Sequence, residues 1–290
     1  MRTAPGKSRK AFRRFGQSIR GAATVLLLAA ATLFSIVPIV WAVLTSLKTP
    51  REVALYPPTF FPKDLTFENY LGAVVNNTTF LHYLFNTVCV VGAATIICLF
   101  CASHAAHAVA RYRFRGSSVL MLAMFSTIMI PGVAVVIPLY LLSIKAGIYD
   151  TILVLILVYS AWLTPTLVWL LRGFIIAIPV QLEEAGRIDG YSRLGVFYRV
   201  TLPLMRPGLL AGSVLIFANI WNEFLLGYSL VQSETARVVQ VGIYANLTDV
   251  GVQWGRLTAA AVTAMVPVLI VFGFLQKAFV QGLSAGAVKG

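Results

Sequence analysis

Long apolar runs constrain this chain more than any other feature of its sequence. Six such runs are separated by shorter polar connections. An apolar helix of about 20 residues crosses a hydrocarbon core about 30 Å thick, and it satisfies its own backbone hydrogen bonds in lipid. The sequence therefore predicts an all-α integral membrane protein with six transmembrane helices. The expected helices cover about residues 22–47, 83–110, 117–142, 151–171, 208–231 and 257–280.

The composition supports a bilayer as the main surroundings of the chain. It is 59% hydrophobic and 11% charged, whereas a soluble domain carries about 25% charged residues. The net charge of +13 could suggest nucleic acid. The basic residues lie between the apolar runs rather than on one polar face, however, so we expect no nucleic-acid partner.

The distribution of basic residues predicts the orientation. Residues 1–21 hold seven basic residues and no acidic one, and the apolar run that follows is longer than the 7–15 residues typical of a signal peptide. With six crossings, 17 of the 23 basic residues fall on the side of the two termini. The positive-inside rule then places both termini in the cytoplasm. We expect a basic N-terminus over 1–21, a transmembrane domain over 22–280 and a cytoplasmic tail over 281–290.

A polar segment, residues 181–207, interrupts the apolar pattern between the fourth and fifth runs. Glu183 and Glu184 suit the first turn of a helix, because carboxylates complement the positive end of the helix dipole. Gly190 supplies a stop signal, and Pro203 marks the return to the membrane. The pattern predicts a short cytoplasmic helix. From these features alone, an ordinary loop between two spans remains the favoured interpretation.

The same segment resembles the cytoplasmic loop of permease subunits of binding-protein-dependent ABC importers. That loop has the pattern Glu-Ala-Ala-x-x-Asp-Gly, followed about nine residues later by Ile-x-Leu-Pro. The matching residues here are Glu184, Ala185, Asp189, Gly190, Phe197, Leu202 and Pro203. Val200 stands for the isoleucine, Gly186 for the second alanine and Tyr191 for a small residue. Glycine in place of alanine weakens a helix by about 1 kcal/mol.

The resemblance implies a coupling helix that docks into a cleft on an ATPase subunit. The implied ATPase-coupling residues are Glu183, Glu184, Ala185, Gly186, Ile188, Asp189, Gly190, Leu202 and Pro203. Glu184 would contact the ATPase, Ala185 and Gly186 would allow close approach, and Asp189 with Gly190 would shape the turn.

The remainder of the chain, from about residue 37 to 290, resembles the shorter of the two permease types in carbohydrate-uptake importers of the maltose-permease type. The segments that carry this similarity are Ser46-Leu47-Lys48, 65–70, Asn86-Thr87, Ala110-Arg111, 131–138, Trp221-Asn222-Glu223-Phe224 and 282–290. The resemblance implies the type I importer permease fold in a bacterial inner membrane, and uptake of a sugar by alternating access. The implied partners are a second homologous permease, two ATPase subunits that bind ATP and Mg, and an extracytoplasmic solute-binding protein.

Three adjacent residues in the fifth run, Trp221, Asn222 and Glu223, are candidates for the translocation path. A charge at membrane depth costs about 2.5–3.5 kcal/mol, so Glu223 is expected to face a cavity or a partner. It could instead lock the fifth helix to a neighbour, or lie near the outer interface with Trp221 as an aromatic anchor.

The sequence shows no phosphate-binding loop of the Walker type, no catalytic constellation and no complete metal-ligand set. We therefore expect no enzymatic activity, no bound cofactor and no metal on this chain. Three alternatives stay open: an ABC permease for a non-sugar solute, a secondary transporter and a membrane-embedded enzyme. Glu223 is the one plausible intramembrane carboxylate, which disfavours the secondary transporter.

Overall fold

The computed structural model describes all residues except 1–6, 113, 245–246, 249–250 and 288–290. The helices are α1 (Lys7–Ser46), α2 (Pro50–Val53), α3 (Glu68–Tyr70), α4 (Thr78–Arg111), α5 (Ser117–Ile128), α6 (Gly132–Lys145), α7 (Ile152–Ala177), α8 (Val180–Ile188), α9 (Arg193–Val196), α10 (Leu202–Leu204), α11 (Arg206–Trp221), α12 (Leu225–Leu230), α13 (Val239–Tyr244) and α14 (Trp254–Ala287). Two segments, η1 (Leu71–Val75) and η2 (Phe197–Thr201), are π-helical. Two short strands, β1 (Leu247–Thr248) and β2 (Gly251–Val252), pair antiparallel.

Four of these helices are long and apolar enough to cross a membrane. They are α1 over Gly21–Ser46, α4, α7, and α14 over Trp254–Phe274. Two bent pairs raise the number to as many as six, if each pair counts as one span: α5 with α6, and Arg193–Leu204 with α11. The all-α membrane fold predicted from the sequence is confirmed.

The single helix predicted over 117–142 is wrong, because the chain bends by 100° between α5 and α6. Pro131 lies at the break in extended geometry, with φ −61° and ψ 135°. A proline has no N–H to continue the helix, and it disfavours helical geometry in the residue before it. Pro138 lies inside α6 and does not interrupt it.

The helix predicted over 208–231 is also divided, since α11 ends at Trp221 and α12 begins at Leu225. The structure extends other helices beyond their predicted ends. α7 continues to Ala177, next to the turn at Pro179, and α1 begins at Lys7, inside the predicted N-terminal segment.

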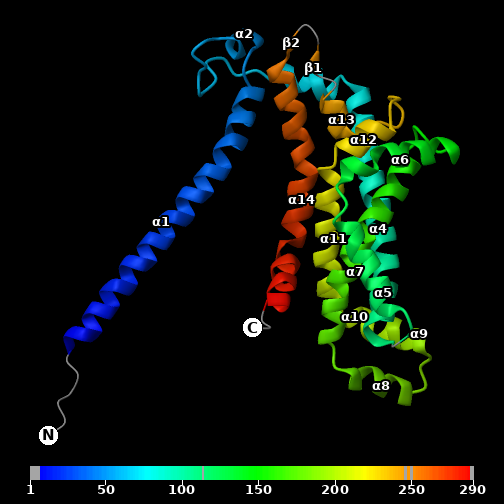
Figure 1. Cartoon of the computed structure of the whole chain (residues 1–290). Coiled ribbons are helices and arrows are strands. Elements are labelled where there is room, and N and C mark those ends of the chain that lie inside the picture. The colour runs from blue at the N-terminus through cyan, green and yellow to red at the C-terminus, as the bar shows by residue number, and fades with distance from the viewer. Residues whose placement is uncertain (1–6, 113, 245–246, 249–250, 288–290) are drawn as a thin grey trace.

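The centre of the bundle is the contact between α4 and α7 (Figure 1). Small residues on α4 recur at intervals of four and are fully buried: Ala94, Cys98, Ala102 and Ala106. Such a stripe lets a second helix approach closely in a membrane. Cys98 is thus a packing residue, whereas Cys101 is exposed.

Figure 1 also shows two distinct ends of the molecule. One end carries α8 and α9, and we call it the α8 end. The opposite end, which we call the far end, carries α2, α12, α13 and the two strands. The first turn of α1 and the last turn of α14 both lie toward the α8 end. α1 diverges from the bundle, and the side chains of residues 21–41 are exposed along it.

Candidate functional site: a short helix at the base of the bundle

α8 is the short helix expected between the fourth and fifth runs. Pro179, in extended geometry, precedes its first residue. Gly190 follows its end with φ 88°, in the left-handed region that glycine adopts without strain. The N–H of Gly190 donates to the carbonyl of Arg187 at 3.0 Å, and that of Tyr191 donates to the carbonyl of Gly186 at 3.1 Å. The helix therefore has a defined end at each side.

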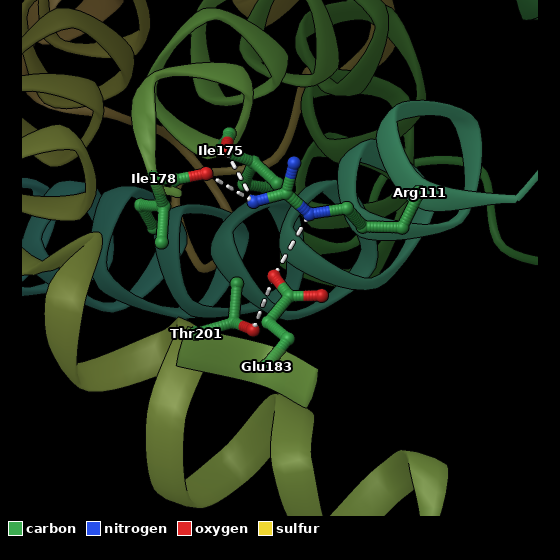
Figure 2. Close-up of polar contacts among 5 residues, drawn as sticks. All are labelled: Arg111, Ile175, Ile178, Glu183 and Thr201. Atoms are coloured by element: carbon green, nitrogen blue, oxygen red, sulfur yellow. Dashed lines mark hydrogen bonds and ion pairs between the residues drawn. The ribbon is translucent and has the colours of Figure 1, made fainter. Parts of the chain in front are cut away.

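Glu183 attaches α8 to the bundle through a buried polar network (Figure 2). Arg111 Nε donates to Glu183 Oε1 at 2.8 Å, and Thr201 Oγ1 donates to the same oxygen at 3.0 Å. Arg111 Nη2 also donates to the carbonyls of Ile175 and Ile178, both at 2.8 Å. The Arg111 and Glu183 side chains are only 9% and 5% exposed. The network joins the ends of α4 and α7 to α8 and η2.

The other face of α8 is open. Ile188 is 87% exposed and Leu182 is 45% exposed, although both are large and apolar. Glu184 and Ala185 are exposed beside them. Several exposed apolar side chains close together, outside the membrane-spanning helices, mark a candidate surface for another protein.

The structure divides the predicted coupling residues into two groups. The exposed group is Glu184, Ala185, Ile188, Asp189 and Gly190. Glu183 and Gly186 are buried instead and position the helix from within, and their role in coupling stays a prediction. Leu202 and Pro203 are half-buried in α10, away from α8 itself.

Gly186, Tyr191 and Val200, the three departures from the family pattern, lie close together. A Cβ atom on Gly186 would lie 3.3 Å from Val200 Cγ2, 3.4 Å from Val196 Cγ2 and 3.7 Å from the Tyr191 ring. The Arg199 guanidinium lies over the Tyr191 ring, 4.6 Å from its centre. The absence of a side chain at Gly186 thus leaves room for the two valines, whereas the tyrosine ring would be in ordinary van der Waals contact with a Cβ atom there.

An aromatic cluster that the sequence did not indicate joins α4 to η2. His104 Nε2 lies 2.7 Å from the hydroxyl oxygen of Tyr198, and the rings of His104 and His107 lie 4.8 and 4.9 Å from that of Phe197. Tyr198, the partner of His104, lies 94 residues further along the chain. No local feature of the sequence indicates a contact between residues so far apart. Across the part of the chain that the structure describes, no group of side chains could hold a metal ion.

The three path candidates of the fifth run have different surroundings. Trp221 is 4% exposed and stacks on Phe217 at 5.2 Å, so it packs in the core of this chain, and its place on the path stays a prediction. Asn222 is exposed, as is Asn219 on the same helix. Glu223 accepts hydrogen bonds from Tyr159 and from the first turn of α12.

A bundle of membrane-spanning helices with a short, outward-facing helix at its base has the architecture of a transport permease. Residues 94–285 match the family described as binding-protein-dependent transport system inner membrane component. The chain belongs to this family, as its resemblance predicted, and it is the permease type of subunit in such a system.

Several curated proteins are similar over most of their length. The chain is 33% identical over 253 residues to the diacetylchitobiose uptake system permease protein DasC of Streptomyces coelicolor, covering 87% of this chain and 91% of that protein. It is 32% identical over 260 residues to the trehalose transport system permease protein SugB of Mycobacterium tuberculosis, covering 89% and 93%. One solved chain, from a bacterial ABC transporter involved in the import of the acidic polysaccharide alginate, has a TM-score of 0.79 at 22% identity, covering 95% and 99%. The last similarity establishes the fold.

Proposed function

We propose that this chain is the permease subunit of an ATP-driven importer that moves a sugar or sugar derivative across the cytoplasmic membrane. The names of the similar permeases support the substrate class, since they include diacetylchitobiose, trehalose and arabinooligosaccharide transport. The proposed complex contains a second homologous permease, two ATPase subunits and an external solute-binding protein. ATP and Mg bind to the ATPase subunits, because this chain has no Walker-type phosphate-binding sequence.

The observation that carries the proposal is the two-sided character of α8. Its outer side exposes Ile188 and Leu182 to a partner, and its inner side is joined to α4 and α7 through Glu183 and Arg111. A push on the exposed side therefore reaches the two most tightly packed helices of the bundle. ATP drives the change of state to the extent that the ATPase binds one state better than the other.

The orientation proposed for the chain places α8 and both termini in the cytoplasm. The excess of basic residues in the connections on that side supports it. A cysteine introduced at Ser192, which is exposed beside α8, should react with an impermeant thiol reagent only from the cytoplasmic side. Labelling from outside would reverse the proposed topology.

For the path, we propose the exposed amide face of α11. Asn219 and Asn222 each donate a side-chain N–H to a carbonyl of their own helix, at 2.8 Å in both cases. Both residues are exposed, and we propose that their amide oxygens accept hydrogen bonds from sugar hydroxyls. Polar side chains on a membrane-spanning helix characteristically face a water-filled cavity or a partner helix.

Replacing Ile188 with Asp tests the function most directly. In the assembled complex, uptake and ATPase retention should fall at least tenfold, because the carboxylate enters an apolar contact. The melting temperature of the isolated chain should not change, since the side chain is 87% exposed. Leu65→Asp is the matched control: that side chain is 71% exposed and lies outside α8. Normal uptake by the Ile188 variant, or uptake driven by an ion gradient without ATP, would contradict the proposal.

A further inference from the structure

Glu223 lies at the break between α11 and α12, where its carboxylate receives three hydrogen bonds. Tyr159 Oη on α7 donates to Oε2 at 2.6 Å, the N–H of Leu226 donates to Oε1 at 2.8 Å, and the N–H of Gly227 donates to Oε2 at 3.2 Å. Tyr159 is 2% exposed. Both carboxylate oxygens are therefore occupied, and one of the three donors comes from a different helix.

No cation of the described residues forms an ion pair with this carboxylate. Among the residues that the structure describes, the ion pair within 4.0 Å is Arg111–Glu183, at the other end of the molecule. A carboxylate in an apolar span is costly unless its surroundings replace water. Three well-placed neutral donors provide that replacement, and they do so only while α12 and α7 stay together.

The local backbone explains why the carboxylate binds here. The first N–H groups of a helix have no partners within the helix, and they form its positive end. Glu223 accepts from two such groups of α12. Gly227 allows the close packing, because a Cβ atom there would lie 3.1 Å from Val238 Cγ2 and 3.6 Å from Tyr159 Oη.

We propose that Tyr159 and Glu223 form a positioning pair that fastens α12 to α7, so that the far end of the bundle follows the movement of α8. The other end of α7 is held by Arg111 through the carbonyls of Ile175 and Ile178. The 16 residues from Tyr159 to Ile175 correspond to about 24 Å of helix. α7 thus carries displacement from the coupling helix to α12 as one rigid element.

The inference rests on the proposed function of α8, and the experiment separates the two. Tyr159→Phe keeps the ring and removes the one hydroxyl that joins α7 to Glu223. In the complete complex in lipid nanodiscs, we expect ATP hydrolysis to remain within about twofold of wild type, while solute moved per ATP falls roughly tenfold or more. Glu223→Gln should act in the same direction, because it removes the charge and one acceptor.

Tyr149→Phe is the matched control. The Tyr149 hydroxyl is buried and has no hydrogen-bond partner among the described residues. Removing it deletes the same atom without breaking the pair, so solute moved per ATP should stay at the wild-type value. Equal loss in the two variants would show a general packing effect and overturn the proposal.

A measured distance between α7 and α12 distinguishes loss of the proposed pair from a simple loss of stability. Spin labels at Leu157 on α7 and Ser229 on α12 should keep one distance with and without ATP in the wild-type complex, and should give two or more distances in Tyr159→Phe. A wild-type distance that changes with nucleotide would overturn the proposal even if the variant failed to fold. Full coupling in Tyr159→Phe, together with loss of uptake in Ile188→Asp, would reject the pair and leave the proposed function intact.

Discussion

Two glutamates at opposite ends of the bundle are stabilised in different ways. Glu183, at the α8 end, pairs with Arg111, which also binds two helix carbonyls. Glu223, at the far end, binds a tyrosine hydroxyl and two backbone N–H groups. Asp150 is stabilised in the same way as Glu223, because its Oδ1 accepts hydrogen bonds from the N–H groups of Gln232 and Ser233 and from the Ser233 hydroxyl.

The difference follows the distribution of cations in the sequence. In the predicted topology, 17 of the 23 basic residues lie in the segments on the α8 side. Arginine there can bind one carboxylate and two carbonyls together, since its guanidinium presents five donors in a fixed plane. A hydroxyl or a backbone N–H donates only one hydrogen bond to a carboxylate. The carboxylates at the far end therefore each connect fewer segments of the chain than the Arg111–Glu183 pair does. The α8 end is therefore expected to be the more sensitive to loss of a single side chain.

Arg111→Ala should have the largest effect of the changes that test this difference. It leaves Glu183 buried without its cation and removes the donor to Ile175 and Ile178, and breaking a buried pair costs about 3–5 kcal/mol. We expect a fall of that size in the free energy of unfolding, measured by denaturant titration in detergent.

Two further variants make the Arg111 result specific. Arg115→Ala removes an exposed arginine four positions along and should change the free energy by less than about 0.5 kcal/mol. Combining Arg111→Ala with Glu183→Gln should cost less than the sum of the two single changes, because the unpaired charge is gone. Additive losses would mean that the ion pair does not hold α8.

Asp150→Asn tests how far neutral hydrogen-bond donors stabilise a charged carboxylate at the far end. Burial tends to raise the pKa of the Asp150 carboxyl, but the hydrogen bonds from Ser233 and Gln232 lower the pKa below its ordinary value of 3.8. Because the pKa is lower in the folded state, the stabilisation is present above about pH 4 and is lost as pH falls through the folded-state pKa. At pH 7 the variant should lose roughly 1–1.5 kcal/mol, the difference between a charged and a neutral hydrogen bond.

The pH dependence makes the Asp150 prediction specific. The melting temperatures of the wild type and Asp150→Asn should converge below pH 4, as the wild-type carboxyl becomes protonated. Ser233→Ala should lower the melting temperature less, since it removes one of the three donors. A gap between wild type and variant that is equally large at pH 7 and pH 3 would show that the charge of Asp150 does not contribute.

Much of the fold could be predicted because membrane-spanning helices have a strong local signal. The apolar runs indicated the all-α bundle, and Gly190, Pro203 and the paired glutamates indicated α8. The sharp break at Pro131 could not be predicted, because a proline in a membrane helix is compatible with both a mild kink and a full break. Which one occurs depends on the neighbouring helices.

The site was only partly predictable, for a related reason. The sequence showed that Glu183 and Glu184 begin a helix, but which one points inward depends on Arg111, 72 residues away. Likewise, Glu223 was recognisable as a costly charge, whereas Tyr159 resembles any tyrosine of an apolar run. Contacts between distant segments, rather than local pattern, decide these roles.

Gly190→Val asks whether α8 is positioned by its terminal turn as well as by Glu183. A Cβ atom at Gly190 would meet nothing within 4 Å, so the effect is backbone strain alone. At φ 88° that strain amounts to about 1–2 kcal/mol. We expect a loss of stability in this range and reduced uptake by the complex. Gly190→Asn should lose less of both, because asparagine tolerates the left-handed region; equal losses would point to a lost contact with a partner instead.

Gly186→Ala should have the smallest effect, because two contributions oppose each other. Alanine in the middle of a helix gains about 1 kcal/mol over glycine, but its Cβ would lie 3.3 and 3.4 Å from the stiff side chains of Val200 and Val196. We expect a net gain below about 1 kcal/mol. Gly173→Ala isolates the first contribution, since Gly173 lies inside α7 and a Cβ there meets nothing within 4 Å.

The difference between the Gly186 and Gly173 results measures how firmly η2 is held against α8. A full gain at Gly186 would mean that the valines move aside freely, and that the α8 end is less rigid than the Arg111 network suggests. A net loss at Gly186, relieved when Val200→Ala is added, would show instead that glycine is kept there to accommodate the valine side chain.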